Sequence, residues 1–177
     1  MNIEATHAGQ RTTVGLLPAA PQRKRYRSAG WLDVLTGLSR SDNPNFARML
    51  KQSAYPVQKA YRQLMETYGG EPLFVECRST TRQQWAFVAD EIGVPGEFRV
   101  QYFDEDGFTG HLVYKTVEEA VESMLLERYR IVEPGALDRI AATARWARGV
   151  KVATLRQQAQ EDLISFTEML DAIQALE

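Results

Sequence analysis

The stretch PLFVECRSTTRQQWAFVADEIGVPGEFRVQYFDEDGFTGHLVY, residues 72–114, contains four short runs rich in β-branched and aromatic residues. These runs cover residues 72–78, 84–90, 97–103 and 108–114. Tight turn signals separate them, such as Pro95-Gly96 and the sequence DEDG before Phe108. Connections this short cannot carry the crossover that parallel strands need. We therefore predict a four-stranded antiparallel meander over about residues 72–114.

The residues before this stretch have the period of amphipathic helices. Apolar residues repeat at helical spacing from Trp31 to Leu38. Pro44 follows the capping residue Asn43, and proline is favoured in the first turn of a helix. Pro56 is interpreted in the same way, as the start of another helix. We thus expect two separate helices here, at about 44–52 and 56–68.

Further helices are predicted after the meander. A capping box of Thr116 and Glu119 begins a helix that we expect to run to about Tyr129. Pro134-Gly135 predicts the start of a short helix around Leu137 and Ile140, and the disturbed period of residues 143–149 predicts a bend or loop. A second capping box, Ser165 with Glu168, begins the last helix. The apolar stripe of that helix comprises Phe166, Met169, Leu170, Ile173 and Leu176.

A small sheet must bury at least one face, and these helices are the material available to cover it. The predicted fold is therefore α+β, with the antiparallel meander packed against N-terminal and C-terminal helices. Residues 1–28 lack periodicity, and we interpret them as a basic flexible arm before a single domain at 29–177. The chain has one cysteine and no apolar run near the roughly 18 residues that span a membrane, so we expect a cytoplasmic protein.

The net charge of −2 conceals segments of opposite sign. Residues 1–30 carry a balance of +4, residues 97–127 a balance of −6, and residues 128–160 a balance of +5. From Glu161 to the end of the chain there are five acids and no base. This alternation points to charged surfaces that recognise a partner.

Motifs for catalysis, cofactors or metals are not found in the sequence, so we predict no catalytic, cofactor-binding or metal-binding residue and do not expect an enzyme. The acidic turn at 103–108 lacks the ligand spacing of an EF-hand and is better interpreted as a hairpin turn. Cys77 and His111 could form a nucleophile and base pair if they met in space, but a buried structural cysteine is the favoured interpretation. Two histidines and one cysteine are too few for a closed zinc site.

The acidic segment provides the leading candidate for a partner-binding surface. Asp104, Glu105 and Asp106 are predicted at a hairpin tip, and Glu118 and Glu119 on the helix that follows. At about 100° per residue, one stripe of that helix would hold Glu118, Glu122, Leu126 and Tyr129. A leucine and a tyrosine beside glutamates would suit a partner with a basic surface. Alternatively, Leu126 and Tyr129 pack beneath the segment 131–150, and the glutamates only favour the helix dipole.

Two functions remain open. The first is a non-catalytic protein-binding module, an adaptor or an inhibitor, of the kind that phages and plasmids could use against host defence complexes. It would dock the acidic hairpin and helix on a basic protein. The alternative is a nucleic-acid-binding accessory protein that uses the basic arm and the basic segment 139–156. The bases for that role are Arg23, Lys24, Arg25, Arg27, Arg145, Arg148 and Lys151.

Overall fold

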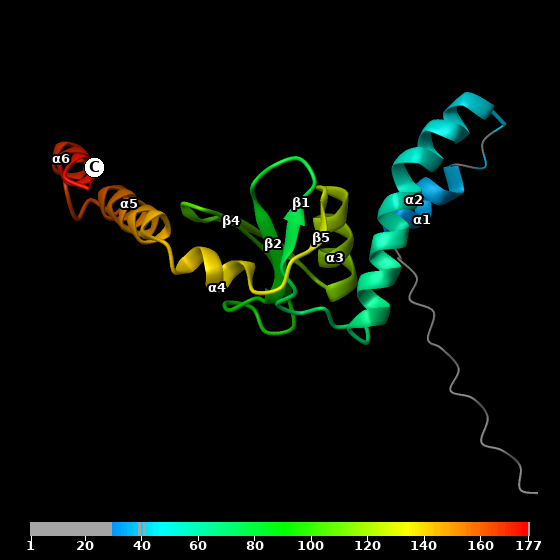
Figure 1. The fold of residues 1–177 in the computed structure, drawn as a ribbon, viewed down its shortest axis with the longest axis horizontal. Helices are drawn as coiled ribbons and strands as arrows, with labels where there is room; N and C mark the ends of the chain where they lie inside the picture. The colour runs from blue at the N-terminus through cyan, green and yellow to red at the C-terminus, as the bar shows by residue number, and fades with distance from the viewer. Residues whose placement is uncertain (1–29, 39, 41, 177) are drawn as a thin grey trace, which may run out of the picture.

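A computed structural model of the chain describes residues 30–38, 40 and 42–176 and has the predicted α+β fold (Figure 1). The described helices are α1 Trp31–Leu38, α2 Pro44–Thr67, α3 Val117–Leu126, α4 Ala136–Ala141, α5 Ala144–Gln160 and α6 Phe166–Gln174. The strands are β1 Cys77–Ser79, β2 Trp85–Asp90, β3 Phe98–Asp104, β4 Gly107–Tyr114 and β5 Tyr129–Val132. The proposed arm at residues 1–28 lies outside the described residues.

The sheet is antiparallel and has the order β4-β3-β2-β1-β5 (Figure 1). The predicted meander is confirmed, and a fifth strand is added beside β1. The first predicted strand, at 72–78, is shorter than expected, because Phe74 takes a φ of 58° and regular pairing starts only at Cys77. A left-handed φ interrupts the extended backbone that a strand needs.

The helix after the meander ends at Leu126, so our expectation that it reaches Tyr129 was wrong. Arg128 adopts a φ of 76°, which ends the helical path. The next residues, Tyr129–Val132, then form β5 and pair with β1. Tyr129 therefore belongs to a strand and not to the helix face that the sequence suggested.

A single helix, α2, occupies residues 44–67, so the predicted division at Pro56 was also wrong. Pro56 lies on the exposed side of the helix, where water can satisfy the carbonyl that loses its partner. On the opposite side, buried residues continue through the proline without a break, among them Ala54, Val57 and Tyr61. Their packing holds the helix together across a residue that would otherwise end it.

Residues 143–149 are not the bend or loop that we predicted. The break is confined to Thr143, whose hydroxyl accepts a hydrogen bond from the Trp146 N–H at 3.1 Å and caps α5. The helical period is disturbed because Trp146 packs against aromatic residues of the sheet and not in a stripe along α5. Its ring centroid lies 5.2 Å from that of Phe108 and 6.3 Å from that of Phe103.

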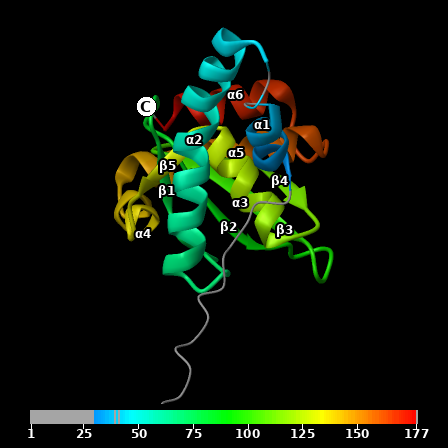
Figure 2. The same ribbon diagram turned by 90° about the vertical axis from the view of Figure 1, so that its right-hand side faces the viewer.

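The two faces of the sheet have separate hydrophobic cores. One face packs on α1, α2 and α3, with Cys77, Val88 and Val100 at its centre. The other packs on α4 and on Trp146 of α5, through Trp85 and Phe103 among others. Figure 2 looks onto α2 and α3 with the strands behind them. In Figure 1, the pair α1–α2 and the pair α5–α6 lie at opposite ends of the molecule.

Candidate functional site

Cys77 and His111 do not meet. Cys77 lies on β1 and His111 on β4, and strands β2 and β3 separate them in the sheet. Burial raises the pKa of the Cys77 thiol to about 12, whereas a nucleophilic cysteine needs a lowered pKa. His111 is exposed. Cys77 therefore has the environment of a structural cysteine.

Among the described residues, no group of three or more histidine, cysteine, aspartate or glutamate side chains could hold a metal ion. The acidic turn forms the β3–β4 hairpin, as the sequence indicated. Its side chains are engaged with the protein itself. Asp104 accepts a hydrogen bond at 2.9 Å from the backbone N–H of Asp106.

The acidic hairpin tip contacts the basic segment of the same chain. Arg145 of α5 donates to both carboxylate oxygens of Asp106, at 2.9 and 2.7 Å, and also to Glu105. These bonds lower the pKa of Asp106 and raise the pKa of Arg145. Two of the predicted acidic contacts and one predicted nucleic-acid contact thus form an internal ion-pair cluster.

The residues predicted to share a stripe after Glu118 are separated in the structure. Glu118 and Glu119 are exposed in the first turn of α3. Glu122 is buried, and its Oε1 accepts a hydrogen bond from the Leu32 N–H. Leu126 is half-buried against the core.

Tyr129, the last member of that predicted stripe, lies in β5. It is buried beside Tyr102, and its hydroxyl donates to the Gln84 side chain at 3.4 Å. Glu118 and Glu119 are therefore the members of the predicted surface that remain open to solvent without an ion pair to another described residue.

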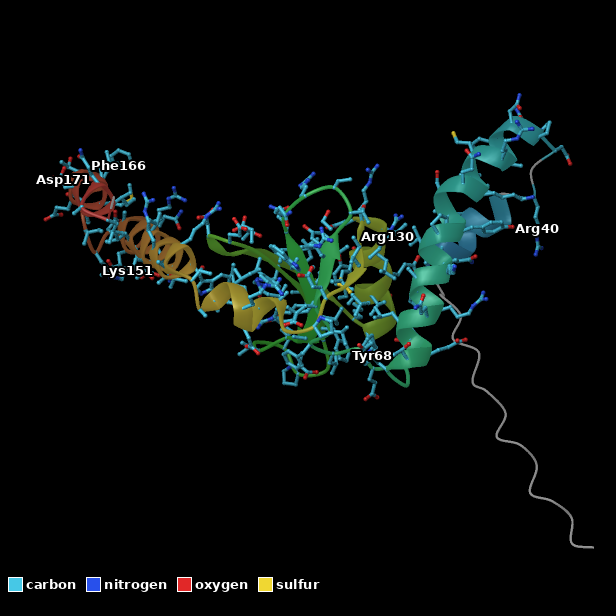
Figure 3. The ribbon with its side chains drawn as sticks, viewed as in Figure 1. Arg40, Tyr68, Arg130, Lys151, Phe166 and Asp171 are labelled. Atoms are coloured by element: carbon cyan, nitrogen blue, oxygen red, sulfur yellow. The ribbon has the colours of Figure 1, made fainter. Side chains whose placement is uncertain are left out.

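Only some of the basic residues predicted to bind nucleic acid lie in the described part of the chain. Arg148 and Lys151 lie exposed on α5, the helix that also carries the engaged Arg145. Figure 3 labels Lys151 on this helix, which contacts the sheet at β4. Arg23, Lys24, Arg25 and Arg27 lie outside the described residues.

An apolar surface on α6 and the turn before it was missed by sequence reasoning. Leu163 and Phe166 are each 68% exposed and Leu170 is 48% exposed. The sequence placed Phe166 and Leu170 on a stripe with Met169, but Met169 is the one residue of α6 that is fully buried among those described. Amphipathic periodicity could not show that, among the described elements, α6 packs mainly against α5. Figure 3 shows Phe166 and Asp171 at the far end of the molecule from Arg40.

The segment that carries this apolar surface also carries exposed acidic side chains. Glu161, Asp162, Glu168 and Asp171 are exposed in the same segment. Glu168 forms the predicted capping box with Ser165, whose backbone N–H donates to it at 2.8 Å. We call Leu163, Phe166 and Leu170, together with these four acids, the α6 surface.

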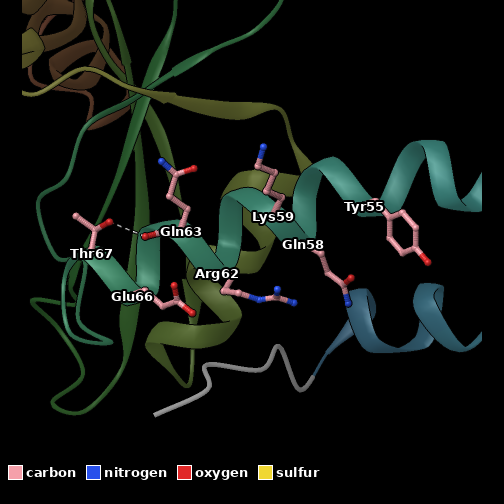
Figure 4. Close-up of a pocket in the computed structure, with 7 residues that line it drawn as sticks. All are labelled: Tyr55, Gln58, Lys59, Arg62, Gln63, Glu66 and Thr67. Atoms are coloured by element: carbon pink, nitrogen blue, oxygen red, sulfur yellow. Dashed lines mark hydrogen bonds between the residues drawn. The ribbon is translucent and has the colours of Figure 1, made fainter. Parts of the chain in front are cut away.

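The structure also has surface depressions. One, of about 480 Å³, runs along the outer face of α2, and Figure 4 shows the side chains that line it. Its described lining comes from one helix and is mostly polar, including Lys59, Arg62 and Glu66. A second, of about 670 Å³, is lined by polar residues beside Tyr129, among them Arg82. A third, of about 280 Å³, lies between α2, α3 and β5 and has apolar walls.

Within the part of the chain that the structure describes, no helix is both long and apolar enough to cross a membrane. Comparison of the chain with models of known protein families, with curated proteins and with solved structures finds no match.

Proposed function

We propose that this protein is a non-catalytic protein-binding module, an adaptor or an inhibitor in the cytoplasm, that docks on a basic protein through the α6 surface. The observation that supports this proposal most is the exposure of Leu163, Phe166 and Leu170 on a helical hairpin at one end of the molecule. The proposal keeps the basic partner predicted from the sequence and moves the contact to a different acidic segment.

The exposed apolar side chains favour association. Burial of a phenylalanine or leucine side chain contributes about 1.5–3 kcal/mol. Phe166 and Leu170 are four residues apart and so share one side of α6. An aromatic residue with a neighbouring leucine can fill a partner's pocket and supply most of the binding energy. Helix α6 itself packs on α5, which leaves this side of it uncovered by other described elements.

The charge of the α6 surface indicates the kind of partner. The chain from residue 161 onward carries acids and no base, so an approaching protein with a basic rim would be attracted and oriented. A second copy of this chain would complement the acidic α6 surface less well than a separate basic protein. Its basic helix is α5, where Arg145 is already engaged by Asp106 and Glu105 of the same chain.

The test uses the full-length protein and a partner captured from the source cell in the presence of nuclease, then purified. We compare wild type with Phe166→Ser and Leu170→Ser. We expect each substitution to weaken binding by about tenfold or more, because about 1.4 kcal/mol corresponds to a factor of ten. The affinity should also fall as salt is raised, because the acids contribute to attraction. Unchanged folding is checked by circular dichroism and by the urea midpoint.

Ile92→Ser is the matched control. Ile92 is 83% exposed in the loop between β2 and β3, outside the α6 surface, so its removal should leave binding unchanged. Equal binding by wild type and Phe166→Ser would contradict the proposal. So would a homodimer, measured by light scattering, that Phe166→Ser converts to a monomer, because the surface would then be a contact between copies.

A further inference from the structure

The third depression is a small pocket at the open edge of the layer formed by α2, α3 and the sheet. Its volume is about 280 Å³, near the lower limit of the range typical of small-molecule sites. The apolar walls come from α2, α3 and the neighbouring strands β1 and β5, with Leu64, Cys77, Leu125 and Val132 among them. Gln63, on α2, adds a polar side chain, which is labelled in Figure 4.

Arg130 of β5 is the charged group of this pocket. Its side chain is half-buried, and its Nε donates to the carbonyl of Leu125 at 2.8 Å. Figure 3 places Arg130 between α3 and α2. Burial and the neighbouring Arg128 lower its pKa, which means that the charged form is less well stabilised than in water.

Among the described residues, Arg130 forms no ion pair. By contrast, Arg78 of β1 and Arg139 of α4 both form ion pairs with Glu133. A guanidinium that has lost part of its hydration and has no carboxylate partner gains from any anion that reaches it. Within the described part of the chain, the hydrogen bond of Arg130 uses Nε, which leaves its terminal nitrogens available for that role.

We infer that this pocket binds a small aliphatic carboxylate, with the carboxylate on Arg130 and the hydrocarbon chain against Leu64, Leu125 and Val132. A planar guanidinium offers two parallel donors that match a carboxylate. One cation and a small apolar volume suit a monoanion with a short hydrocarbon body better than a phosphate group, which attracts several bases. The site is separate from the α6 surface and does not depend on the proposed function.

The test measures binding of octanoate to the full-length protein by calorimetry, with octanol and octylamine as probes of the same chain length. We expect octanoate to bind at one saturable site, octanol at least about tenfold more weakly, and octylamine more weakly still. Because each buried CH₂ strengthens binding about fourfold, hexanoate should bind roughly fifteenfold more weakly than octanoate.

Two substitutions separate the roles of the charge and the cavity. Arg130→Met should reduce octanoate affinity about tenfold or more, whereas Arg128→Met removes an exposed neighbouring charge and should leave the affinity within about twofold. Val132→Phe adds bulk at a half-exposed position of the pocket wall and should block octanoate while Arg130 is intact. If Arg130→Met does not fold, Val132→Phe still tests whether octanoate binds in this pocket.

If octanoate shows no saturable binding up to millimolar concentration, the inference is overturned. Equal affinity for octanol, or full affinity in folded Arg130→Met and Val132→Phe, would overturn it as well.

Discussion

The carboxylate of Glu122 on α3 accepts a hydrogen bond from the backbone N–H of Leu32, in the first turn of α1, at 2.5 Å. The two residues are ninety positions apart in the sequence. Gly30 passes so close that an added Cβ would lie 2.7 Å from Glu122 Oε2. A helix N-terminus has unpaired N–H groups and a partial positive charge, so a carboxylate is well placed there. Glu122 is therefore an internal cap that attaches α1 to the core.

We predict that Glu122→Ala lowers the free energy of unfolding by about 1–3 kcal/mol, because a buried N–H loses its acceptor. Urea unfolding followed by circular dichroism measures the change. Glu118→Ala, on an exposed part of the same helix, is the control and should change stability by less than about 0.5 kcal/mol. Equal effects of the two substitutions would contradict the capping role. Although the sequence placed Glu122 on the candidate partner-binding surface, a Glu122→Lys substitution would destabilise the fold through the lost cap. It therefore cannot test binding at that surface.

Gly149 of α5 is predicted to resist substitution by alanine. A Cβ at this position would lie 1.8 Å from the backbone oxygen of Asp106, so α5 and the β3–β4 hairpin could not keep their contact. We expect Gly149→Ala to reduce the free energy of unfolding by about 1–3 kcal/mol, the usual cost of overpacking, although alanine favours a helix.

Gly37 of α1 is the matched control for this prediction. Among the described residues, no heavy atom outside the adjoining backbone of α1 and the two neighbouring residues lies within 4 Å of a Cβ placed there. Gly37→Ala should therefore stabilise the protein by up to about 1 kcal/mol through helix propensity alone. Thermal and urea unfolding of both variants measure the difference. A Gly149→Ala protein as stable as Gly37→Ala would mean that α5 does not press on the hairpin.

Glu133 should make stability depend on pH. It accepts hydrogen bonds from Trp85 Nε1 at 3.1 Å, Arg78 Nε at 2.9 Å and Arg139 Nη2 at 2.5 Å. The Trp85 bond, and then the two arginines, lower the pKa of Glu133. A lowered folded-state pKa gives stability that is present above the unfolded value, about 4.3, and is lost as pH falls through the folded value.

We therefore predict that Glu133→Gln costs about 1 kcal/mol at neutral pH and progressively less below about pH 4. The measurement is the free energy of unfolding in urea between acid and neutral pH. Glu118→Gln, at an exposed site with no ion pair to another described residue, should follow the wild-type profile. A constant difference between Glu133→Gln and wild type at all pH values would show that the ionised carboxylate does not contribute.

The sheet was predictable because its signals are local. Alternation of apolar residues marks the strands, and the tight turns at Pro95-Gly96 and before Gly107 make each strand pair with the next one along the chain. No contact between distant segments is needed to predict this order. The capping box of Ser165 and Glu168 is local in the same way and was confirmed. β5 could not be predicted from local signals, because its residues pair with β1 at a sequence separation of fifty or more residues.

The candidate surfaces were harder to predict, because charge along a sequence does not show which charges meet in the fold. Asp106 was assigned to the partner-binding surface and Arg145 to the nucleic-acid-binding alternative, but in the structure the two side chains form an ion pair. Glu122 fits the polar pattern of an exposed helix face, but in the fold the N-terminus of α1 packs over it. Phe166 fits a buried stripe, but no described element other than α5 packs substantially on α6. Each error concerns whether segments that are far apart in sequence make contact in the fold.

Nucleic-acid binding is still a prediction. Because Arg145 is ion-paired within the chain, it should contribute less to DNA binding than an unpaired base on the same helix, and this difference can be measured. Binding of a fluorescent DNA duplex is measured by anisotropy as salt is varied, because each neutralised phosphate adds about 0.9 to the slope of log affinity against log salt. Lys151→Gln should reduce that slope by about 1, whereas Arg145→Gln should change it less, because two carboxylates already oppose the Arg145 charge. Replacement of Arg23, Lys24, Arg25 and Arg27 by alanine should reduce it further.

The double substitution Glu105→Gln with Asp106→Asn releases Arg145 from the hairpin tip and should therefore strengthen DNA binding and raise the slope. This increase distinguishes direct use of α5 from a general attraction between DNA and a basic arm, which the hairpin substitutions would affect little. If the full-length protein does not bind DNA or RNA at low salt, the nucleic-acid alternative is removed. The α5 bases would then act within the protein, where Arg145 holds the helix to the β3–β4 hairpin.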